Sequence, residues 1–224
     1  MHWTNRDNAP SVGRVVTLNA RSVARLSVGL KVVMAASGAL LVLYLVAHML
    51  GNLKFFVGQA SFDHYAAWLR TIGSPVLPSS GYLWLQRAVL SVAVVAHIVS
   101  AAILARRNRR VRYAHRRPVQ GSYAARTMRW GGVIIALFTV YHVLVLADAQ
   151  HPYDDVVAQF RRWPVVLVYT LAILAVGFHL RHGIDSALRT LGRRGGSSLA
   201  LVVAVGISAG FLSVPLSVLF GLVH

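Results

Sequence analysis

The chain has 224 residues, of which 56 % are hydrophobic and only 13 % charged, and its mean hydropathy is +0.59. An ordinary globular chain holds roughly 45–50 % apolar and about 25 % charged residues, so neither a soluble globular chain nor a disordered one fits. Cys is absent, which excludes a disulfide scaffold, a thiolate-bound iron–sulfur cluster and a Cys nucleophile within this chain. The net charge of +17 is also found in nucleic-acid binders, but here the Arg residues lie between apolar runs. That arrangement indicates a membrane protein.

Five apolar stretches are long enough to cross a bilayer, because about 20 helical residues cover a hydrocarbon core about 30 Å thick. None alternates in hydropathy as a barrel strand would, so each is predicted to be a helix. The predicted fold is therefore an all-α integral membrane protein, a five-transmembrane-helix bundle spanning residues 28–223 after an N-terminal arm at 1–27. The predicted spans, numbered 1 to 5, are residues 28–53, 82–105, 130–149, 164–188 and 198–223.

The basic residues predict the orientation of these spans. Eighteen of the 23 Lys and Arg residues lie in the N-terminal segment through Lys31, in residues 106–129 and in residues 181–194, which all fall on one side of the membrane. The positive-inside rule puts that side in the cytoplasm. The N-terminus is then cytoplasmic and the C-terminus outside. Since topology accounts for the charge, we predict no nucleic-acid partner.

Two connecting segments have patterns of their own. Residues 54–81 carry Phe62, Tyr65, Leu69 and Ile72 at helical spacing, which predicts a short amphipathic helix on the outer surface. Residues 108–127 are too polar to cross a membrane and are predicted to be a cytoplasmic linker.

Four consecutive predicted spans each contain at least one His. Ionisable side chains inside spans are rare, usually face the bundle interior and are functional by default. A single intramembrane His is as often a hydrogen-bonded packing residue, but four consecutive spans that each supply one indicate a shared site. These residues are His48 in span 1, His97 in span 2, His142 in span 3, and His179 and His182 in span 4.

The depths of these histidines predict two pairs. His48 and His142 each lie six residues before a charged residue at the outer end of their span, about 9 Å along a helix axis. His97 lies about 13 Å and His179 about 15 Å from the first Arg beyond the inner end, with His182 at about 10 Å. One pair therefore lies in an outer layer and the other in a layer nearer the cytoplasm.

Two neutral imidazoles that face each other in an apolar bundle are typical of a bis-His haem b. A zinc site is less suitable, because zinc usually takes four clustered ligands. We favour His179 over His182 as the ligand from span 4. His182 and Arg181 would then suit interactions with haem propionates. Arg181 is equally well explained as an anchor whose side chain snorkels to the membrane surface. Glycines beside the ligands would admit a macrocycle or serve ordinary helix packing: Gly38, Gly51, Gly131, Gly132, Gly177 and Gly183.

The segments "SVGLKVVMAASGALLVLYLVAHMLGNLKFF" and "FDHYAAWLR" resemble the opening of the single-chain cytochrome b subunit of bacterial succinate:quinone oxidoreductases. That family's pattern is close to S-x-G-x-K-x-x-M-A-x-[ST]-G, then H-x-x-G-N-L, then F-x-x-Y-A-x-x-L. The later stretch "FHLRHGIDSALRTLG" resembles its H-L-x-H-G-x-x-S-A-x-x-T-L-G motif. The resemblance covers roughly residues 25–195, and span 5 matches only by position.

The resemblance implies a membrane-anchor subunit with five spans and two b haems in a bacterial cell membrane. His48 and His142 would hold the outer haem, and His97 and His179 the inner one, as the depths also predict. A flavoprotein subunit would oxidise succinate, and an iron–sulfur subunit would pass electrons to this chain. The haems would relay them to a quinone, typically menaquinone.

The quinone contacts follow less directly from the pattern. Lys31 is also explained as a positive-inside anchor, and Trp68 as an interfacial belt residue. The candidates are Ser27, Lys31 and Ser37 for an inner site, and Asp63, His64, Tyr65 and Trp68 for an outer site.

Several alternatives stay open on the sequence alone. The same complex can run as a fumarate reductase, and other di-haem anchors serve nitrate reductases or formate dehydrogenases. A haem-free transporter with a His proton relay is the rival from a different class. The quinone type, the haem potentials, the oligomeric state and any further small subunit are not determined by the sequence.

Overall fold

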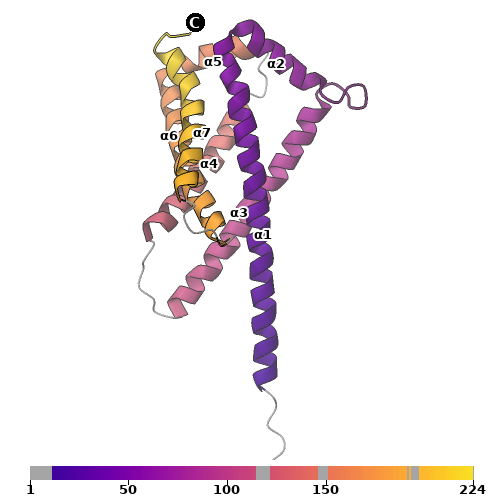
Figure 1. Ribbon diagram of the computed structural model, residues 1–224, viewed down its shortest axis with the longest axis vertical. Coiled ribbons are helices and arrows are strands. Elements are labelled where there is room, and N and C mark those ends of the chain that lie inside the picture. Colours follow the sequence, from indigo (N-terminus) through magenta and orange to yellow (C-terminus); the bar gives the residue numbers. More distant parts are fainter. Residues whose placement is uncertain (1–11, 115–121, 146–150, 191, 193–196, 224) are drawn as a thin grey trace, which may run out of the picture. The chain divides into compact units, whose positions relative to one another are not determined.

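The computed structural model describes residues 12–114, 122–145, 151–190, 192 and 197–223, and the side chains of 28–109, 127–145, 151–189, 192 and 197–223. Within these residues the regular structure is entirely helical, and no strand occurs. The predicted all-α class is therefore confirmed. The elements in chain order are α1 (Val12–Leu53), η1 (Lys54–Val57), α2 (Gln59–Thr71), α3 (Gly81–Ala114), α4 (Ser122–Val145), α5 (Pro152–Phe160), α6 (Trp163–Thr190) and α7 (Ser197–Leu219) (Figure 1).

Five of these helices are long and apolar enough to cross a membrane, as the sequence predicted. Large apolar side chains are exposed along them, for example Leu43 at 68 %, Leu144 at 71 % and Val202 at 68 %. A soluble monomer rarely exposes so much contiguous apolar surface, whereas a bilayer would cover it. The five stretches are Val28–Val57, Gly81–Arg109, Thr127–Val145, Trp163–Arg189 and Ser197–Leu219.

The helices extend further into the predicted linker than expected. Helix α3 continues to Ala114 and α4 begins at Ser122, so most of residues 108–127 is helical and only 115–121 lie outside the described part. The basic composition of this segment excluded a membrane span but not a helix, because Arg is a good helix former. The sequence predicted a cytoplasmic linker here and did not predict its regular structure.

The chain divides into two compact units. Unit 1 comprises Met1–Ala39 and Val92–Arg117, and unit 2 comprises Leu40–Ser91 and Pro118–His224. In unit 1 the first part of α1 meets the second part of α3, and Ser37, Ala93 and Ser100 are buried there. Unit 1 therefore contains His97, and unit 2 contains the four other span histidines.

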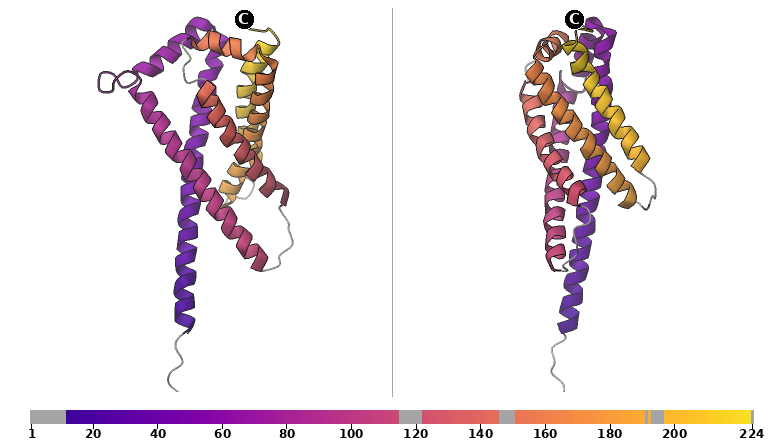
Figure 2. Two further views of the ribbon diagram at one scale, coloured as in Figure 1. Left: turned by 180° about the vertical axis from the view of Figure 1, so that it is seen from behind. Right: turned by 90° about the vertical axis from the view of Figure 1, so that its left-hand side faces the viewer.

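Unit 2 is organised around α6. This helix packs against α4 and α7, and Figure 2 shows α6 and α7 side by side in both views. Its main core lies where η1, α5, the start of α6 and the end of α7 meet. Phe55 is completely buried there and stacks on Tyr153 with ring centres 4.6 Å apart. Burial of a side chain of this size stabilises the fold by about 1.5–3 kcal/mol.

Side chains of α2 form hydrogen bonds with the first turn of α5. The predicted amphipathic helix is present as α2, although Ile72 falls just beyond its end. The Asp63 carboxylate on α2 accepts a hydrogen bond from the backbone N–H of Tyr153 at 3.0 Å, in the first turn of α5. The Gln59 amide donates to Asp154 at 3.2 Å. A carboxylate at a helix N-terminus satisfies a backbone donor and favours the helix dipole, so the two helices stabilise each other.

Helix α5 itself was not predicted. Its sequence does carry a start signal, because Pro152 occupies the first helical position and Asp154 and Asp155 lie in the first turn. The helix has only nine residues, so it falls below the length at which hydropathy alone indicates a helix.

We expect Asp63→Ala to lower the free energy of unfolding by about 1 kcal/mol, the usual cost of losing an N-terminal cap. His64→Ala, on the exposed face of the same helix, serves as the matched control and should change it by less than about 0.5 kcal/mol. Denaturant titration of the detergent-solubilised chain followed by circular dichroism would measure both. Equal stabilities of the two variants would contradict a capping role for Asp63.

Candidate functional site

The structure brings His48 and His142 together in unit 2. Their ring centres are 5.9 Å apart and the ring planes lie at 76°. A metal–imidazole bond is about 2 Å long, so imidazoles on opposite sides of one metal have ring centres roughly 6 Å apart. The separation of the two rings therefore fits a single metal held between α1 and α4.

Aromatic side chains surround this pair. Tyr44 stacks on His48 with ring centres 5.4 Å apart, and Phe211 of α7 lies 5.6 Å from the same imidazole. Phe138 stacks on His142 at 5.6 Å. These rings make the surroundings apolar, which suits neutral imidazoles and a flat hydrophobic macrocycle.

Polar groups lie beside both histidines of the pair. The Tyr169 hydroxyl lies 3.1 Å from Nδ1 of His142. The Asn52 amide donates to the backbone carbonyl of His48 at 2.8 Å, and its nitrogen lies 3.5 Å from Nε2 of that imidazole. Neither Tyr169 nor Asn52 was predicted from the sequence as a site residue. Asn52 lies one helical turn after His48 and could have been found from that spacing.

His97 contacts a backbone carbonyl in unit 1. Its Nδ1 lies 3.2 Å from the backbone oxygen of Met34. A carbonyl oxygen can only accept a hydrogen bond, so this contact favours the tautomer with the proton on Nδ1 and the lone pair on Nε2. Metal-bound histidines usually have this arrangement, in which the second nitrogen donates to a carbonyl or carboxylate.

Ser37, a candidate quinone residue, is buried beside this imidazole. Its hydroxyl donates to the Val33 carbonyl at 2.7 Å and its oxygen lies 3.4 Å from Nδ1 of His97. A Cβ on the neighbouring Gly38 would lie 3.2 Å from Cε1 of the same ring. Both small residues therefore leave room for the imidazole.

His179 and His182 lie on α6 in unit 2. The Nδ1 atom of His179 is fully buried, and a Cβ at Gly132 would lie 3.7 Å from its Cε1. His182 is half-buried and Arg181 is exposed. Because His97 belongs to unit 1, the pairing of His97 with His179 stays a prediction, as does the choice between His179 and His182.

The predicted glycines have different neighbours. Gly38 and Gly132 lie against imidazoles, as described above. A Cβ on Gly51 would lie 2.9 Å from the hydroxyl of Tyr65, and one on Gly177 would lie 2.5 Å from the hydroxyl of Ser208 on α7. Gly51 and Gly177 therefore allow side chains of α2 and α7 to approach, which is a helix-packing role.

The four outer quinone candidates all lie on α2, but they face different surroundings. Asp63 caps α5, and His64 is exposed. Tyr65 packs on Gly51, stacks on Trp68 with ring centres 5.8 Å apart, and has the Lys54 ammonium 5.5 Å from its ring. Of the inner candidates, Lys31 is exposed, and the Ser27 side chain lies outside the described residues.

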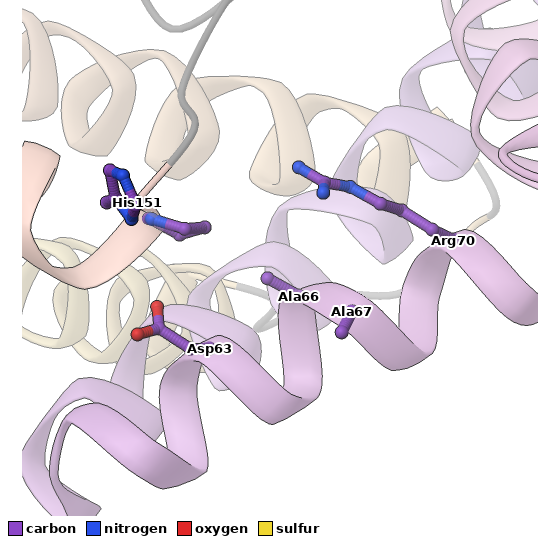
Figure 3. A pocket seen from close by; sticks show the side chains of 6 residues that line it. Asp63, Ala66, Ala67, Arg70 and His151 are labelled. Carbon is purple, nitrogen blue, oxygen red and sulfur yellow. The ribbon is translucent and has the colours of Figure 1, made fainter.

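An open pocket of about 230 Å³ lies between α2 and the start of α5. In Figure 3 the Asp63 carboxylate, the Arg70 guanidinium and the His151 imidazole are drawn around it. Asp63 is the one outer candidate among its lining residues, and Arg70 and His151 were not predicted. The lining residues are Asp63, Ala66, Ala67, Arg70, His151 and Pro152.

Among the described side chains, no group of three or more His, Asp or Glu could hold a metal ion. A haem needs only two ligands from the protein, because the porphyrin supplies the other four. The His48–His142 pair fits this donor set. Aromatic rings surround it, and the Tyr169 hydroxyl lies within hydrogen-bonding distance of Nδ1 of His142.

The comparisons with known proteins point to one family. Residues 104–213 match the model of the succinate dehydrogenase/fumarate reductase transmembrane subunit family. This match supports the family resemblance. The matched stretch contains His142, His179 and His182, whereas His48 and His97 lie before it. It also reaches into α7, where the sequence showed no motif. No curated protein and no solved structure matches the chain. Together with the five apolar helices, the family match indicates a multi-pass membrane protein.

Gly38 provides a test of the imidazole packing in unit 1. We expect Gly38→Val to lower the free energy of unfolding by about 1–3 kcal/mol relative to Gly29→Val, because the added methyl groups would overpack against His97. Gly29 lies on the same helix, and a Cβ there meets nothing within 4 Å among the described residues. Chemical denaturation of both variants in detergent would measure the difference, and equal stabilities would contradict the close packing.

Proposed function

We propose that this chain is the membrane-anchor cytochrome b subunit of a bacterial succinate dehydrogenase, and that it carries electrons from an iron–sulfur subunit through two b haems to menaquinone or another quinone. The observation that carries the proposal is the His48–His142 pair with ring centres 5.9 Å apart. The family match over residues 104–213 supports the choice of enzyme complex.

In this proposal His48 and His142 hold the outer haem iron, and His97 and His179 hold the inner one. A bound haem supplies reversible one-electron chemistry at its iron. The chain would supply neutral imidazole lone pairs, and the contact of Nδ1 of His97 with the Met34 carbonyl favours a lone pair on Nε2. Phe138, Phe211 and the other aromatic rings would exclude water around the outer pair. His182 and Arg181 would contact the propionates.

Partner subunits complete the reaction. Succinate is oxidised in a flavoprotein subunit, and the basic cytoplasmic segments of this chain are available to dock the soluble subunits. Two haems in series across the bacterial cell membrane allow the membrane potential to act on the transferred electron. That effect is worth about 2.3 kcal/mol per charge per 100 mV, which helps succinate to reduce a low-potential quinone.

The quinone would bind at one or both ends of this route. On the inner side we propose Ser27, Lys31 and Ser37. On the outer side, Asp63 and Tyr65 offer protonatable groups beside the exposed Trp68 and His64. A fumarate reductase would use the same residues in the opposite direction, and the matched family includes both enzymes.

The haem content tests the proposal directly. Purified with its co-purifying subunits, the chain should give about two b haems in a pyridine haemochrome assay, and succinate should reduce at least part of them. Absence of haem would contradict the proposal and favour a proton-coupled transporter. One haem per chain would retain a cytochrome but contradict one of the two His pairs.

Single variants test the pairing. We expect His48→Ala and His142→Ala each to retain one haem. The retained haem should have the same spectrum and midpoint potential in both variants, because each variant loses a ligand of the same haem. His151→Ala, which replaces an exposed His, should retain two haems. If His48→Ala and His142→Ala retained different haems, the proposed pair would be wrong.

A further inference from the structure

Tyr169 is a buried polar residue behind the outer His pair. It lies on α6 with 6 % of its surface exposed. Its ring packs almost perpendicular to the rings of Phe138 and Phe160, with both pairs of ring centres 4.9 Å apart. Two neighbouring helices, α4 and α5, contribute these contacts, so the position of the ring is closely defined.

The Tyr169 hydroxyl contacts two polar groups. It lies 3.1 Å from Nδ1 of His142, and the Gln159 amide of α5 donates to its oxygen at 3.4 Å. A phenol oxygen can accept two hydrogen bonds, so it can receive the Gln159 amide and the imidazole N–H together. The direction of its hydrogen bond with His142 depends on which nitrogen of the imidazole carries the proton.

An imidazole can bind a metal only through an unprotonated nitrogen, and the hydrogen bond at the other nitrogen decides which one that is. When Nδ1 of His142 donates to Tyr169, Nε2 keeps its lone pair. The opposite arrangement, with the phenol donating to Nδ1, would put the proton on Nε2 and block the metal. A metal on Nε2 therefore requires that the Tyr169 oxygen accept the hydrogen bond from Nδ1.

We propose that Tyr169 is a positioning residue for His142: it accepts the Nδ1–H hydrogen bond, directs Nε2 toward the haem iron and raises the basicity of this ligand. The inference rests on the proposed function, since it assumes that His142 binds a haem. His97 has a backbone carbonyl in the equivalent role, which a side-chain substitution cannot remove. The acceptor for His142 is a single side-chain hydroxyl that can be deleted without changing the ring.

Deleting that hydroxyl should change the midpoint potential of the haem in a direction that follows from charge. A hydrogen bond from the distal N–H makes an imidazole a stronger electron donor, which stabilises the ferric over the ferrous state. Tyr169→Phe should therefore raise the midpoint potential of the haem that His142 binds. The low-spin ferric EPR signal of the same haem should shift, because the imidazole is no longer held in one orientation.

The experiment compares Tyr169→Phe with Tyr141→Phe in the complex purified from membranes. Tyr141 lies nearby, with ring centres 6.3 Å from Tyr169, and within the described residues its hydroxyl has no hydrogen bond to an imidazole. Haem content, redox titration and EPR of the oxidised complex are measured for both variants and the wild type. We expect one haem to shift in Tyr169→Phe, the other to stay unchanged, and neither to move in Tyr141→Phe.

The outcomes separate this inference from the proposed function. Absence of haem in the wild type would overturn both. Two haems in the wild type, with potentials and EPR signals of Tyr169→Phe that equal those of Tyr141→Phe, would overturn the positioning role alone. Loss of only the His142 haem from Tyr169→Phe would support it, since the retained haem shows an intact fold. Loss of both haems from this variant alone would overturn it, because Tyr169 would then be a structural residue.

Discussion

A polar group on a membrane-spanning helix has no water to bind, so it must find its partner within the protein. Several hydroxyls in the apolar helices follow this constraint by donating to carbonyls of their own helix: Ser100 to Ala96, Thr139 to Ile135 and Ser217 to Val214. Ser208 is an exception among the described residues, because its buried oxygen has no hydrogen-bond partner. The imidazoles of His97 and His142 contact groups on a neighbouring helix instead.

The same constraint gives the proposed site its chemistry. An imidazole with one nitrogen held by an acceptor presents a lone pair at the other, which is the state that a metal requires. The acceptors differ in kind, a backbone oxygen for His97 and a phenol for His142. A backbone acceptor depends only on helix position, whereas a side-chain acceptor is open to change in evolution. In the proposed electron route, the His48–His142 pair is therefore the part whose electronic properties the sequence can adjust most easily.

Features that depend on run length and spacing could be predicted from the sequence. Apolar runs predicted five spanning helices, and the equal distance of His48 and His142 from the span ends predicted a shared layer; the rings lie 5.9 Å apart. Features that depend on which helices are neighbours could not be predicted. Tyr169 is 27 residues from His142, and Asp63 is 90 residues from the backbone it caps. Gly51 and Gly177 could be recognised as small residues, but their neighbours Tyr65 and Ser208 could not.

The hydrogen bond from Tyr153 to Asp63 joins segments that precede and follow two of the apolar helices. The first turn of α5 can fray only if the carboxylate on α2 releases it, and α2 in turn contacts α5 through Gln59. The two short helices should therefore open as one cooperative unit, with a shared free energy of local unfolding. Amide hydrogen exchange in α2 and α5 would then report the same free energy of opening. Neither helix is long enough to protect its amides from exchange on its own.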